Sequence, residues 1–468
     1  MTDSPTITFY GAAGTVTGSK YLLHAHGRKI LLDAGLFQGL KELRLRNWAA
    51  PPFDCSSINA VVLSHAHIDH SGYLPILVRH GFHGKIYCSY GTEDLLTILL
   101  PDAARLQAEE AEFANEGGFS KHSPALPLFT MDDATAVLRR LEPLPYHEDF
   151  QVSPHIKARF CRAGHILGAS IVEMEIGGNG TVPHKLVFSG DLGRWDRPIL
   201  REPELVLEAD TLLLESTYGD RLHASGGEEQ LARIVHEIVQ KKGTLIIPAF
   251  AIDRSQEIMW VLRELEDSGK IPVIPVFLDS PMAMNASIIY GRHPEDHDTE
   301  MARLIKEDGT PLGTKNFTYV RGQAESIRLN KMNGPMIIVS ASGMATGGRV
   351  LHHLERKLPD PDTIVLFAGF QAQGTRGRLL EDGAASIKIH GADVPVHAQV
   401  KRLEGFSAHA DQKEIMRWLA GFRRAPKKTF IVHGEPESAE TLASLMKEQL
   451  GWDVEVARDS ETRVLFEE

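Results

Sequence analysis

Cysteine is scarce in this chain of 468 residues, and long uncharged apolar runs are missing altogether. The three cysteines, Cys55, Cys88 and Cys161, are odd in number and widely spaced, which excludes a disulfide framework and a CxxC metal knuckle. We interpret them as small buried apolar side chains. No run reaches the about 18 uncharged residues of a membrane span, and residues 1–14 lack the basic and apolar regions of a signal peptide. These absences predict a cytoplasmic protein without a membrane partner.

The sequence also has no excess of positive charge. It contains 50 Lys and Arg residues and 62 Asp and Glu residues, which gives a formal net charge of −12. This balance argues against a protein that coats nucleic acid, although a local basic groove can coexist with an acidic exterior. The sequence also lacks internal repeats and low-complexity segments. Its 43% apolar and 24% charged residues are typical of a globular protein. At this length, two or three domains are expected.

The pattern of apolar residues changes along the chain. Over the first 200 residues, short apolar segments such as "KILLDAG" and "AVVLSHAH" alternate with glycine turns, which predicts closely spaced strands with some helices between them. From about residue 210, near-continuous apolar runs such as "GTLIIPAF" and "PMIIVSAS" alternate with helical patterns such as "RSQEIMWVLRELEDSG". Alternation of this kind predicts a mostly parallel α/β sheet covered on both faces. After about residue 397 the pattern changes again.

One short segment is unusually rich in metal-binding side chains. "SHAHIDHSG", residues 64–72, follows the apolar run "AVVL" and carries His65, His67, Asp69 and His70. Further candidates stand at or just beyond the ends of apolar, strand-like runs, and these are Asp33, His165, Asp191, Glu215 and His433. Strand ends are rigid, so they can hold several side chains toward one edge with the precision that a metal site needs.

Imidazoles and carboxylates are typical ligands of zinc or another borderline first-row divalent ion, such as Mn²⁺ or iron. Two ions about 3.5–4 Å apart, bridged by Asp191, would share a hydroxide that is nucleophilic at neutral pH. Other histidines carry no such pattern. The "HAH" at His24 and His26 lies in an amphipathic strand and is interpreted as surface. Ordinary polar positions are also assigned to His352, His353, His390 and His397.

These residues resemble the metallo-β-lactamase superfamily, whose HxHxDH signature stands here as "HAHIDH". More narrowly, the chain resembles the β-CASP branch of RNA- and DNA-processing nucleases, which insert a domain before the final histidine. Asp191 and His433 are 433 − 191 = 242 positions apart, in agreement with such an insertion. The resemblance implies an α/β protein in which residues 1–208 and 397–468 form a metallo-β-lactamase αββα sandwich. Residues 209–396 would form the inserted α/β β-CASP domain.

The resemblance also implies a role for each site residue. Asp33 would orient a ligand near the metals, and His65, His67 and His165 would hold one zinc. Asp69, His70 and His433 would hold the other zinc, with Asp191 bridging the two. The branch-specific motifs match at Glu215 in "LLLESTYGDR", His409 in "GFSAHAD" and His433 in "FIVHGEP". We predict that His409 is the general acid and that Glu215 accepts its other N–H, since imidazole titrates near neutral pH. An alternative interpretation of Glu215 and His409 is that Glu215 caps a loop and His409 begins a helix.

Histidine at position 433 favours RNA, because RNA-processing members of the branch have histidine there whereas DNA-repair members have an apolar residue. We therefore predict a zinc-dependent (endo)ribonuclease that acts on single-stranded RNA, in a cleft between the two domains, with a homodimer as an open alternative. Two other functions stay open: a DNA nuclease of the same fold, and a catalytically inactive RNA-binding scaffold subunit. Such scaffolds lose metal ligands, whereas no expected ligand is missing here.

Glycine-rich turns and arginines in and near the expected insertion are candidates for holding phosphate. The arginines are Arg221, Arg254, Arg349, Arg376 and Arg378, with surface solvation as the alternative role for each. The basic segment "FRRAPKK" is open in the same way. Asp253, in "PAFAIDRSQE", stands where the family pattern has glycine, so the shape of this loop is in question.

Overall fold

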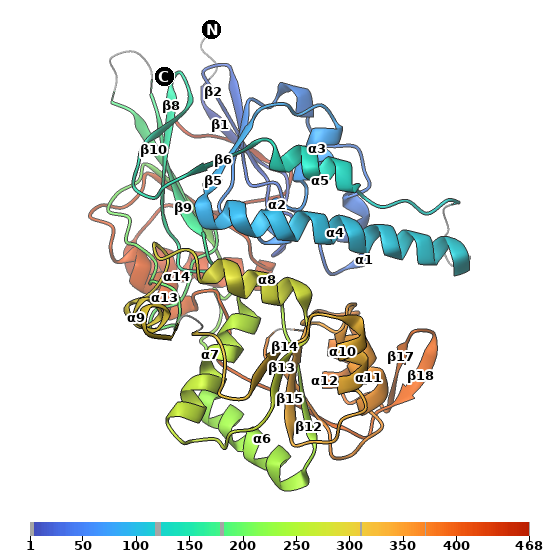
Figure 1. Cartoon of the computed structure of the whole chain (residues 1–468). Helices are drawn as coiled ribbons and strands as arrows, with labels where there is room; N and C mark the ends of the chain where they lie inside the picture. The colour runs from blue at the N-terminus through green and yellow to red at the C-terminus, as the bar shows by residue number, and fades with distance from the viewer. Residues whose placement is uncertain (1–3, 118–122, 178–181, 309–310, 370, 468) are drawn as a thin grey trace. The chain divides into compact units, whose positions relative to one another are not determined.

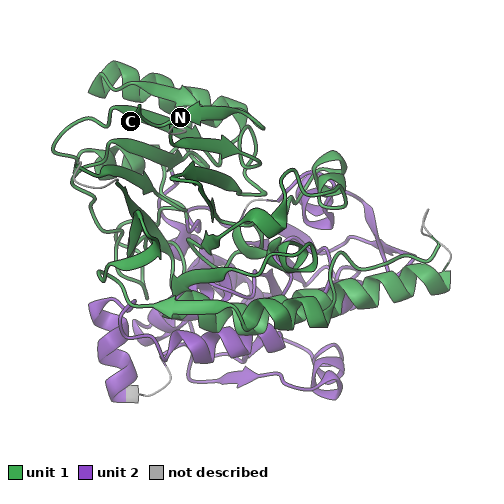
Figure 2. Cartoon of the chain, turned by 90° about the horizontal axis from the view of Figure 1, so that it is seen from above, with its two compact units in different colours: residues 1–222, 409–468 green, residues 223–408 purple. Residues whose placement is uncertain are grey.

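The computed structural model describes residues 4–117, 123–177, 182–308, 311–369 and 371–467. The chain divides into two compact units, coloured separately in Figure 2. Unit 1 comprises residues 1–222 and 409–468, and unit 2 comprises residues 223–408. The first unit is thus built from two stretches of chain that are far apart in the sequence.

The two units divide at 222/223 and 408/409, whereas the domain boundaries expected from the resemblance are 208/209 and 396/397. Strand β11 (Thr211–Glu215) belongs to unit 1, because it pairs with β10 (His184–Phe188) and β20 (Lys428–Val432). Strand β19 (Gln399–Arg402) belongs to unit 2, because it pairs with β16 (Ile364–Phe367). An apolar strand has the same pattern in either unit, so pairing alone decides where it belongs.

Unit 1 contains two seven-stranded sheets in the described part of the chain. The first has the order β22-β1-β2-β3-β4-β5-β6, with bounds Thr462–Val464, Thr6–Phe9, Tyr21–Ala25, Arg28–Leu32, Ala60–Val62, Lys85–Ser89 and Leu141–Leu144. The second has the order β21-β20-β11-β10-β9-β8-β7, and its remaining strands are β21 (Val454–Val456), β9 (Ser170–Ile176), β8 (Ile156–Arg162) and β7 (Phe150–Ser153). Apolar residues of both sheets, such as Ile7, Leu23, Phe160 and Met174, form one buried cluster. The two sheets therefore pack face to face.

Helices cover the outer sides of this sandwich. Helices α3, α4 and α5 pack together, with α4 against β5 and β6, whereas α14 packs against β20 and β21 (Figure 1). The helices of unit 1 are α1 (Lys41–Arg46), α2 (Ile68–Ser71), α3 (Leu74–Arg79), α4 (Tyr90–Gly117), α5 (Met131–Leu138), α13 (Gln412–Leu419) and α14 (Pro436–Leu450), with a 3₁₀ turn at Cys55–Ser57. This layering is the expected αββα sandwich, which confirms the predicted fold class. Among the described helices, none has the length and apolar character to span a membrane.

Unit 2 is an α/β domain with a six-stranded sheet, in which every pair of neighbouring strands is parallel. The strands lie in the order β14 (Phe317–Tyr319), β13 (Val276–Leu278), β15 (Met336–Ser340), β12 (Thr244–Pro248), β16 and β19. Its helices are α6 (Gly227–Lys241), α7 (Arg254–Asp267), α8 (Pro281–Tyr290), α9 (Thr299–Asp308), α10 (Gln323–Leu329), α11 (Val350–Lys357) and α12 (Arg376–Glu381). A separate hairpin consists of β17 (Ser386–Ile389) and β18 (Ala392–Pro395). The prediction of a parallel α/β sheet is confirmed.

The cysteines are free, with Cys55 and Cys88 buried and Cys161 partly exposed. The predicted burial is confirmed for Cys55 and Cys88, whereas Cys161 is only partly buried.

Asp253 lies in a three-residue turn immediately before α7. Its φ of 73° and ψ of −67°, together with a 3.0 Å hydrogen bond from Arg254 N to Ile252 O, define a γ-turn of the rare, strained kind. The side chain is buried, and its Oδ1 accepts a 3.4 Å hydrogen bond from the hydroxyl of Tyr290. The turn therefore keeps a conformation that suits glycine, although aspartate occupies it.

We expect Asp253→Gly to be more stable than Asp253→Ala by about 1–2 kcal/mol, because both variants lose the carboxylate and only glycine relieves the backbone strain. Comparing the two variants removes the contribution of the Tyr290 contact. Urea denaturation of both proteins measures the difference. Equal stability of the glycine and alanine variants would show that the turn is not strained.

Candidate metal centre

The carboxyl ends of several strands of unit 1 carry the candidate ligands. Asp33 directly follows β3, and His65 and His67 lie in the loop after β4, before Asp69 and His70 on α2. His165, Asp191 and His433 follow β8, β10 and β20, respectively. Strands β3 and β4 are parallel, as are β10, β11 and β20, so their carboxyl ends meet at one edge of each sheet. The folded chain brings these residues together because of this strand direction.

Three imidazoles form one half of the centre. Nε2 of His65 lies 3.1 Å from Nδ1 of His67, and Nε2 of His165 lies 3.2 Å from the same atom. Oδ2 of Asp191 lies 3.4 Å from Nε2 of His65 and 3.6 Å from Nε2 of His165. One nitrogen of each ring and one carboxylate oxygen therefore face a common point.

Asp69, His70 and His433 form the other half. The Nε2 atoms of His70 and His433 are 2.9 Å apart, and Oδ2 of Asp69 lies 3.7 Å from Nε2 of His433. Asp191 also reaches this group, with its Oδ2 3.3 Å from Nε2 of His70 and its Oδ1 3.6 Å from Nδ1 of His433. Asp191 thus touches both halves, as the bridging role predicted from the resemblance requires. We call these seven residues the histidine–aspartate cluster: His65, His67, Asp69, His70, His165, Asp191 and His433.

The spacing of the cluster fits divalent metal ions. Two imidazole nitrogens bound to one tetrahedral zinc at about 2.0–2.1 Å stand about 3.3–3.4 Å apart, close to the distances between the rings here. Oδ1 of Asp191 is buried and accepts no hydrogen bond within the described part of the chain. A buried carboxylate oxygen normally has a partner, and a cation would supply one. The donor set and its geometry therefore suit the metal that the sequence predicts.

Asp33 contacts the side of the His70 ring that is opposite the cluster. Its Oδ2 lies 2.7 Å from Nδ1 of His70, and its two oxygens accept hydrogen bonds from the backbone N–H and the hydroxyl of Ser64 at 2.7 and 2.8 Å. With Nδ1 fixed by a carboxylate, Nε2 is directed at the cluster. Asp33 and His433 have positive φ angles, 57° and 49°, as residues at functional sites often do. Asp33 is thus suited to the orienting role expected for it.

Burial and mutual repulsion keep some of the rings neutral. Burial lowers the pKa of His65, assisted by the nearby ring of His70, and burial likewise lowers the pKa of His165, assisted by His409. A neutral imidazole has a lone pair to offer a metal. Burial would raise the pKa of Asp191, but the surrounding histidines hold it well below its ordinary value. His65 and His165 therefore favour the neutral form that binds a metal, and Asp191 favours the ionised form.

His409 and Glu215 lie beside the cluster as a pair. Nδ1 of His409 is 3.2 Å from each carboxylate oxygen of Glu215, and the ring of His409 packs 4.4 Å from that of His165. Glu215 is fully buried and accepts a 2.6 Å hydrogen bond from Leu192 N. Burial opposes protonation of His409, but Glu215 and Asp191 raise its pKa to about 9. This shift favours the protonated imidazole, which is the form that a general acid needs. The same three residues also lie close enough to hold an ion.

Two residues that the sequence analysis did not single out make specific contacts in unit 1, and one of them contacts the cluster. The hydroxyl of Thr217 lies 3.1 Å from Nδ1 of His433 and can fix that ring, and its place two residues after Glu215 in "ESTYGD" was a signal. Lys20 is buried, and its Nζ donates hydrogen bonds to the carbonyls of Gly18 and Gly35 at 2.9 and 2.6 Å. Burial lowers the pKa of Lys20 to about 7. No sequence pattern marks a lysine as buried, so Lys20 could not have been found.

We expect Lys20→Met to destabilise unit 1 by about 2–4 kcal/mol, because two buried carbonyls would lose their donor. Nζ also lies over the rings of Phe37 and Tyr73, at 4.4 and 4.8 Å from their centroids, and these contacts would be lost as well. Thermal and urea unfolding measure the effect. The exposed Lys447, replaced in the same way, is the control and should leave the unfolding curve almost unchanged. Similar curves for both variants would contradict a stabilising role for Lys20.

Two of the candidate phosphate-binding arginines form ion pairs or hydrogen bonds with other residues of unit 2. Arg254 is buried and forms an ion pair with Glu257 on the same helix. Nη1 of Arg349 lies 2.6 Å from Oδ1 of Asp279, and Arg349 also donates to the carbonyls of Val320 and Arg321. These contacts give both arginines a role in holding the unit together.

The other three candidate arginines are more exposed. Arg376 donates to the carbonyls of Lys388 and Thr346, whereas Arg378 pairs with Asp382 and Arg221 with Asp220. Exposed pairs of this kind break at little cost. Phosphate binding stays a prediction for all five arginines. In "FRRAPKK", Arg424 and Lys427 likewise pair with Asp210.

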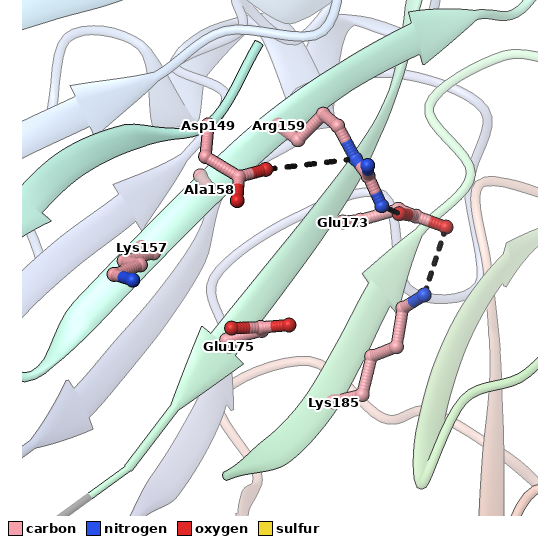
Figure 3. A pocket seen from close by; sticks show the side chains of 7 residues that line it. All are labelled: Asp149, Lys157, Ala158, Arg159, Glu173, Glu175 and Lys185. Atoms are coloured by element: carbon pink, nitrogen blue, oxygen red, sulfur yellow. Dashed lines mark hydrogen bonds and ion pairs between the residues drawn. The ribbon is translucent and has the colours of Figure 1, made fainter. Parts of the chain in front are cut away.

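A shallow hollow on strands β8–β10 of unit 1 is unrelated to the cluster. Figure 3 shows that oppositely charged side chains line it and pair across it, with Arg159 2.8 Å and Lys185 3.1 Å from Glu173. Its lining residues are Asp149, Lys157, Ala158, Arg159, Glu173, Glu175 and Lys185. None of them belongs to the predicted site.

The αββα sandwich and the histidine–aspartate cluster together define the class of metallo-β-lactamase-fold, metal-dependent hydrolases. Comparison with family models agrees. Residues 28–238 match a beta-lactamase superfamily domain, residues 255–380 a Beta-Casp domain, and residues 393–457 a Zn-dependent metallo-hydrolase RNA specificity domain. The metal dependence of the family is therefore established at the level of a divalent ion.

Curated relatives match over nearly the whole chain. Ribonuclease TTHA0252 of Thermus thermophilus is 37% identical over 454 residues, which cover 97% of this chain and 98% of the relative. Transcription termination factor FttA of Methanocaldococcus jannaschii is 32% identical over 459 residues, covering 95% of this chain and 69% of that longer protein. A solved structure of a protein of unknown function from Enterococcus faecalis V583 shares the fold, with a TM-score of 0.56 at 16% identity over 98% of this chain and all of that one. The chain belongs to the β-CASP family of metallo-β-lactamase nucleases.

Proposed function

We propose that this chain is a zinc-dependent ribonuclease that hydrolyses RNA phosphodiester bonds at the histidine–aspartate cluster. The observation that carries the proposal is that Asp191 contacts ligand candidates on both sides, within 3.3–3.6 Å of His65, His165, His70 and His433. A site with one shared carboxylate between two nitrogen-rich groups suits a pair of ions. The names of the relatives, a ribonuclease and a transcription termination factor, support RNA as the polymer.

In this proposal, His65, His67 and His165 hold one Zn²⁺, and Asp69, His70 and His433 hold the other, with Asp191 shared. Mn²⁺ and iron are alternatives, because the same nitrogen and oxygen donors bind them. Bound ions of this kind activate water and neutralise charge on the phosphate oxygens. Asp33 fixes the orientation of His70, and Thr217 fixes that of His433, so both rings keep their direction during turnover.

His409 completes the reaction in this proposal. Water adds to phosphorus and releases one proton to the solvent, the bond to the leaving oxygen breaks, and that oxygen takes up a proton. With Nδ1 on Glu215, the His409 ring delivers the proton from Nε2. Glu215 stabilises the protonated ring before the transfer and holds its plane. Because Glu215 is fully buried and fixed by Leu192 N, the pair is preorganised.

RNA is favoured over DNA by His433 and by the RNA specificity domain match, which spans residues 393–457 and so includes His409 and His433. We test the polymer with zinc-loaded protein and RNA and DNA of matching sequence, labelled at either end, with and without a 5′-phosphate. The proposal expects cleavage of RNA well above that of DNA and about two zinc ions bound per chain at the histidine–aspartate cluster. Equal or faster cutting of single-stranded DNA would favour a DNA nuclease, and little bound zinc would favour an inactive scaffold.

We also propose that the substrate is single-stranded. A duplex of the same RNA is the matched comparison, and sizing of the products separates internal from terminal cutting. A homodimer and a cytoplasmic location stay predictions from the sequence. Light scattering of the zinc-loaded protein measures the first.

A further inference from the structure

A second group of metal-binding side chains lies in unit 2, apart from the residues used above. His352 and Glu355 are three positions apart on α11, so they share one face of that helix. The neighbouring His353 points the other way and is buried, with its Nε2 2.7 Å from Oδ2 of Asp279. His352 and Glu355 remain accessible, His352 being exposed and Glu355 partly exposed.

His390 completes the group from the hairpin of β17 and β18. Ile389 pairs with Ala392, so His390 and Gly391 form a two-residue turn, with φ angles of 48° and 82°. Turns of this type favour Asn-Gly, Asp-Gly or Gly-Gly, and histidine is a less usual choice for the first position. The turn places the His390 ring over α11, 4.6 Å from the ring of His352, with an interplanar angle of 28°.

The framework of this group is rigid. Ile387, Ile389 and Val394 of the hairpin belong to the same buried apolar cluster as Leu351 and Leu354 of α11. Helix and hairpin are thus fixed to each other by packing, and the three polar side chains stand at the edge of that contact. Oε2 of Glu355 lies 3.3 Å from Nδ1 of His390. One ligand atom from each of the three residues lies within 4.8 Å of the others.

Two imidazoles and a carboxylate are a donor set for Zn²⁺ or another borderline divalent ion, with water in the remaining position. Bound nitrogens at a tetrahedral zinc stand about 3.3–3.4 Å apart, so small rotations of exposed side chains bring the three atoms to that spacing. The packing beneath already holds the backbone in place, which lowers the entropy lost on binding.

We propose that His352, Glu355 and His390 form a zinc-binding site on unit 2 that links α11 to the β17–β18 hairpin. The ion would be held at the surface by three protein ligands, and it would stabilise unit 2 by binding only the folded state. The site is built entirely from unit 2, so it does not depend on the histidine–aspartate cluster or on its activity.

The test compares zinc content and stability of the full-length protein with those of His390→Asn and Glu355→Gln. Asparagine suits a turn with positive φ, so His390→Asn removes the ligand and keeps the hairpin. His397→Asn is the matched control, since His397 is another exposed histidine of unit 2, with its Nδ1 3.0 Å from the carbonyl of Pro359. Proteins are dialysed against buffered Zn²⁺, and bound zinc is measured by plasma mass spectrometry.

The proposal expects both ligand variants to bind about one zinc ion fewer per chain than the wild type and His397→Asn. Added Zn²⁺ should raise the melting temperature of the wild type and the control by more than that of the two ligand variants, which keep only the histidine–aspartate cluster. Wild-type zinc content in His390→Asn and Glu355→Gln would overturn the site. An equal loss in His397→Asn would also overturn it, because it would indicate unspecific histidine binding. RNA cleavage by the ligand variants is measured as well, so that the zinc site and the ribonuclease proposal are tested separately. If the protein does not cleave RNA, the difference in zinc content between the ligand variants and the wild type is still expected.

Discussion

Replacing Asp69 by asparagine is expected to lower the single-turnover rate of RNA cleavage by about 10⁴-fold, because several kcal/mol of metal-dependent transition-state stabilisation are lost. Asparagine has the same shape but no negative charge, so it is a weaker ligand for a cation beside His70 and His433. The backbone contacts of this segment, such as Ser19 N to Asp69 O at 2.9 Å, do not involve the side chain. The fold should therefore persist, with an almost unchanged melting temperature.

A control variant distinguishes loss of the Asp69 ligand from the general loss of one negative charge. Asp132→Asn removes one negative charge from an exposed position on α5 and should cleave RNA at the wild-type rate. Bound metal, measured on both variants, should fall only for Asp69→Asn. Cleavage by Asp69→Asn within about tenfold of the wild type, a change of only about 1.4 kcal/mol, would remove Asp69 from the proposed site.

The second large effect is expected for His409→Ala, which should slow RNA cleavage by about 10²–10⁴-fold while the metal content stays at the wild-type level. The proton that Nε2 would deliver to the leaving oxygen is then missing. Glu215→Gln should have a smaller effect, about 10–100-fold, since the ring remains and loses only its anionic partner. His83→Ala, at an exposed histidine of unit 1, is the control and should keep full activity.

A substrate with a good leaving group identifies the role of His409. A p-nitrophenyl phosphodiester needs little protonation of its leaving oxygen, so His409→Ala should hydrolyse it at a rate much closer to that of the wild type. If His409→Ala instead loses metal, then His409 acts as a ligand together with Asp191 and Glu215, and the general-acid assignment is wrong.

Much of the fold followed from local patterns. The apolar runs "KILLDAG" and "AVVLSHAH" overlap β3 and β4, and the helical pattern "RSQEIMWVLRELEDSG" contains α7. Long periodic segments are readable because burial imposes their period. Short or partly exposed elements gave no such signal. Strand β6, with "LEPL", and strand β14, with "FTY", are half-buried and hold their places through pairing with neighbours.

Exposed histidines illustrate the limit of local patterns. The sequence analysis assigned ordinary polar positions to His352, His353 and His390, yet the structure places them in two different environments. His353 is buried against Asp279, whereas His352 and His390 stack on the surface beside Glu355. Position 390 lies 38 positions after position 352 (390 − 352 = 38), so only the packing of the hairpin on α11 brings the two rings together.

The sequence by itself determined the kinds of ligand and their placement at strand ends, because HxHxDH and the isolated Asp and His residues after apolar runs are local features. The change in apolar pattern near residue 210 also indicated a separate α/β segment, and the family resemblance implied that this segment is an insertion. Only the tertiary structure decided which sheet takes β11 and β19, how Asp191 contacts both halves of the cluster, how Thr217 contacts His433, and that Lys20 is buried. Those outcomes depend on contacts between residues far apart in the chain. Strand pairing and packing create these contacts, and the local sequence pattern does not predict them.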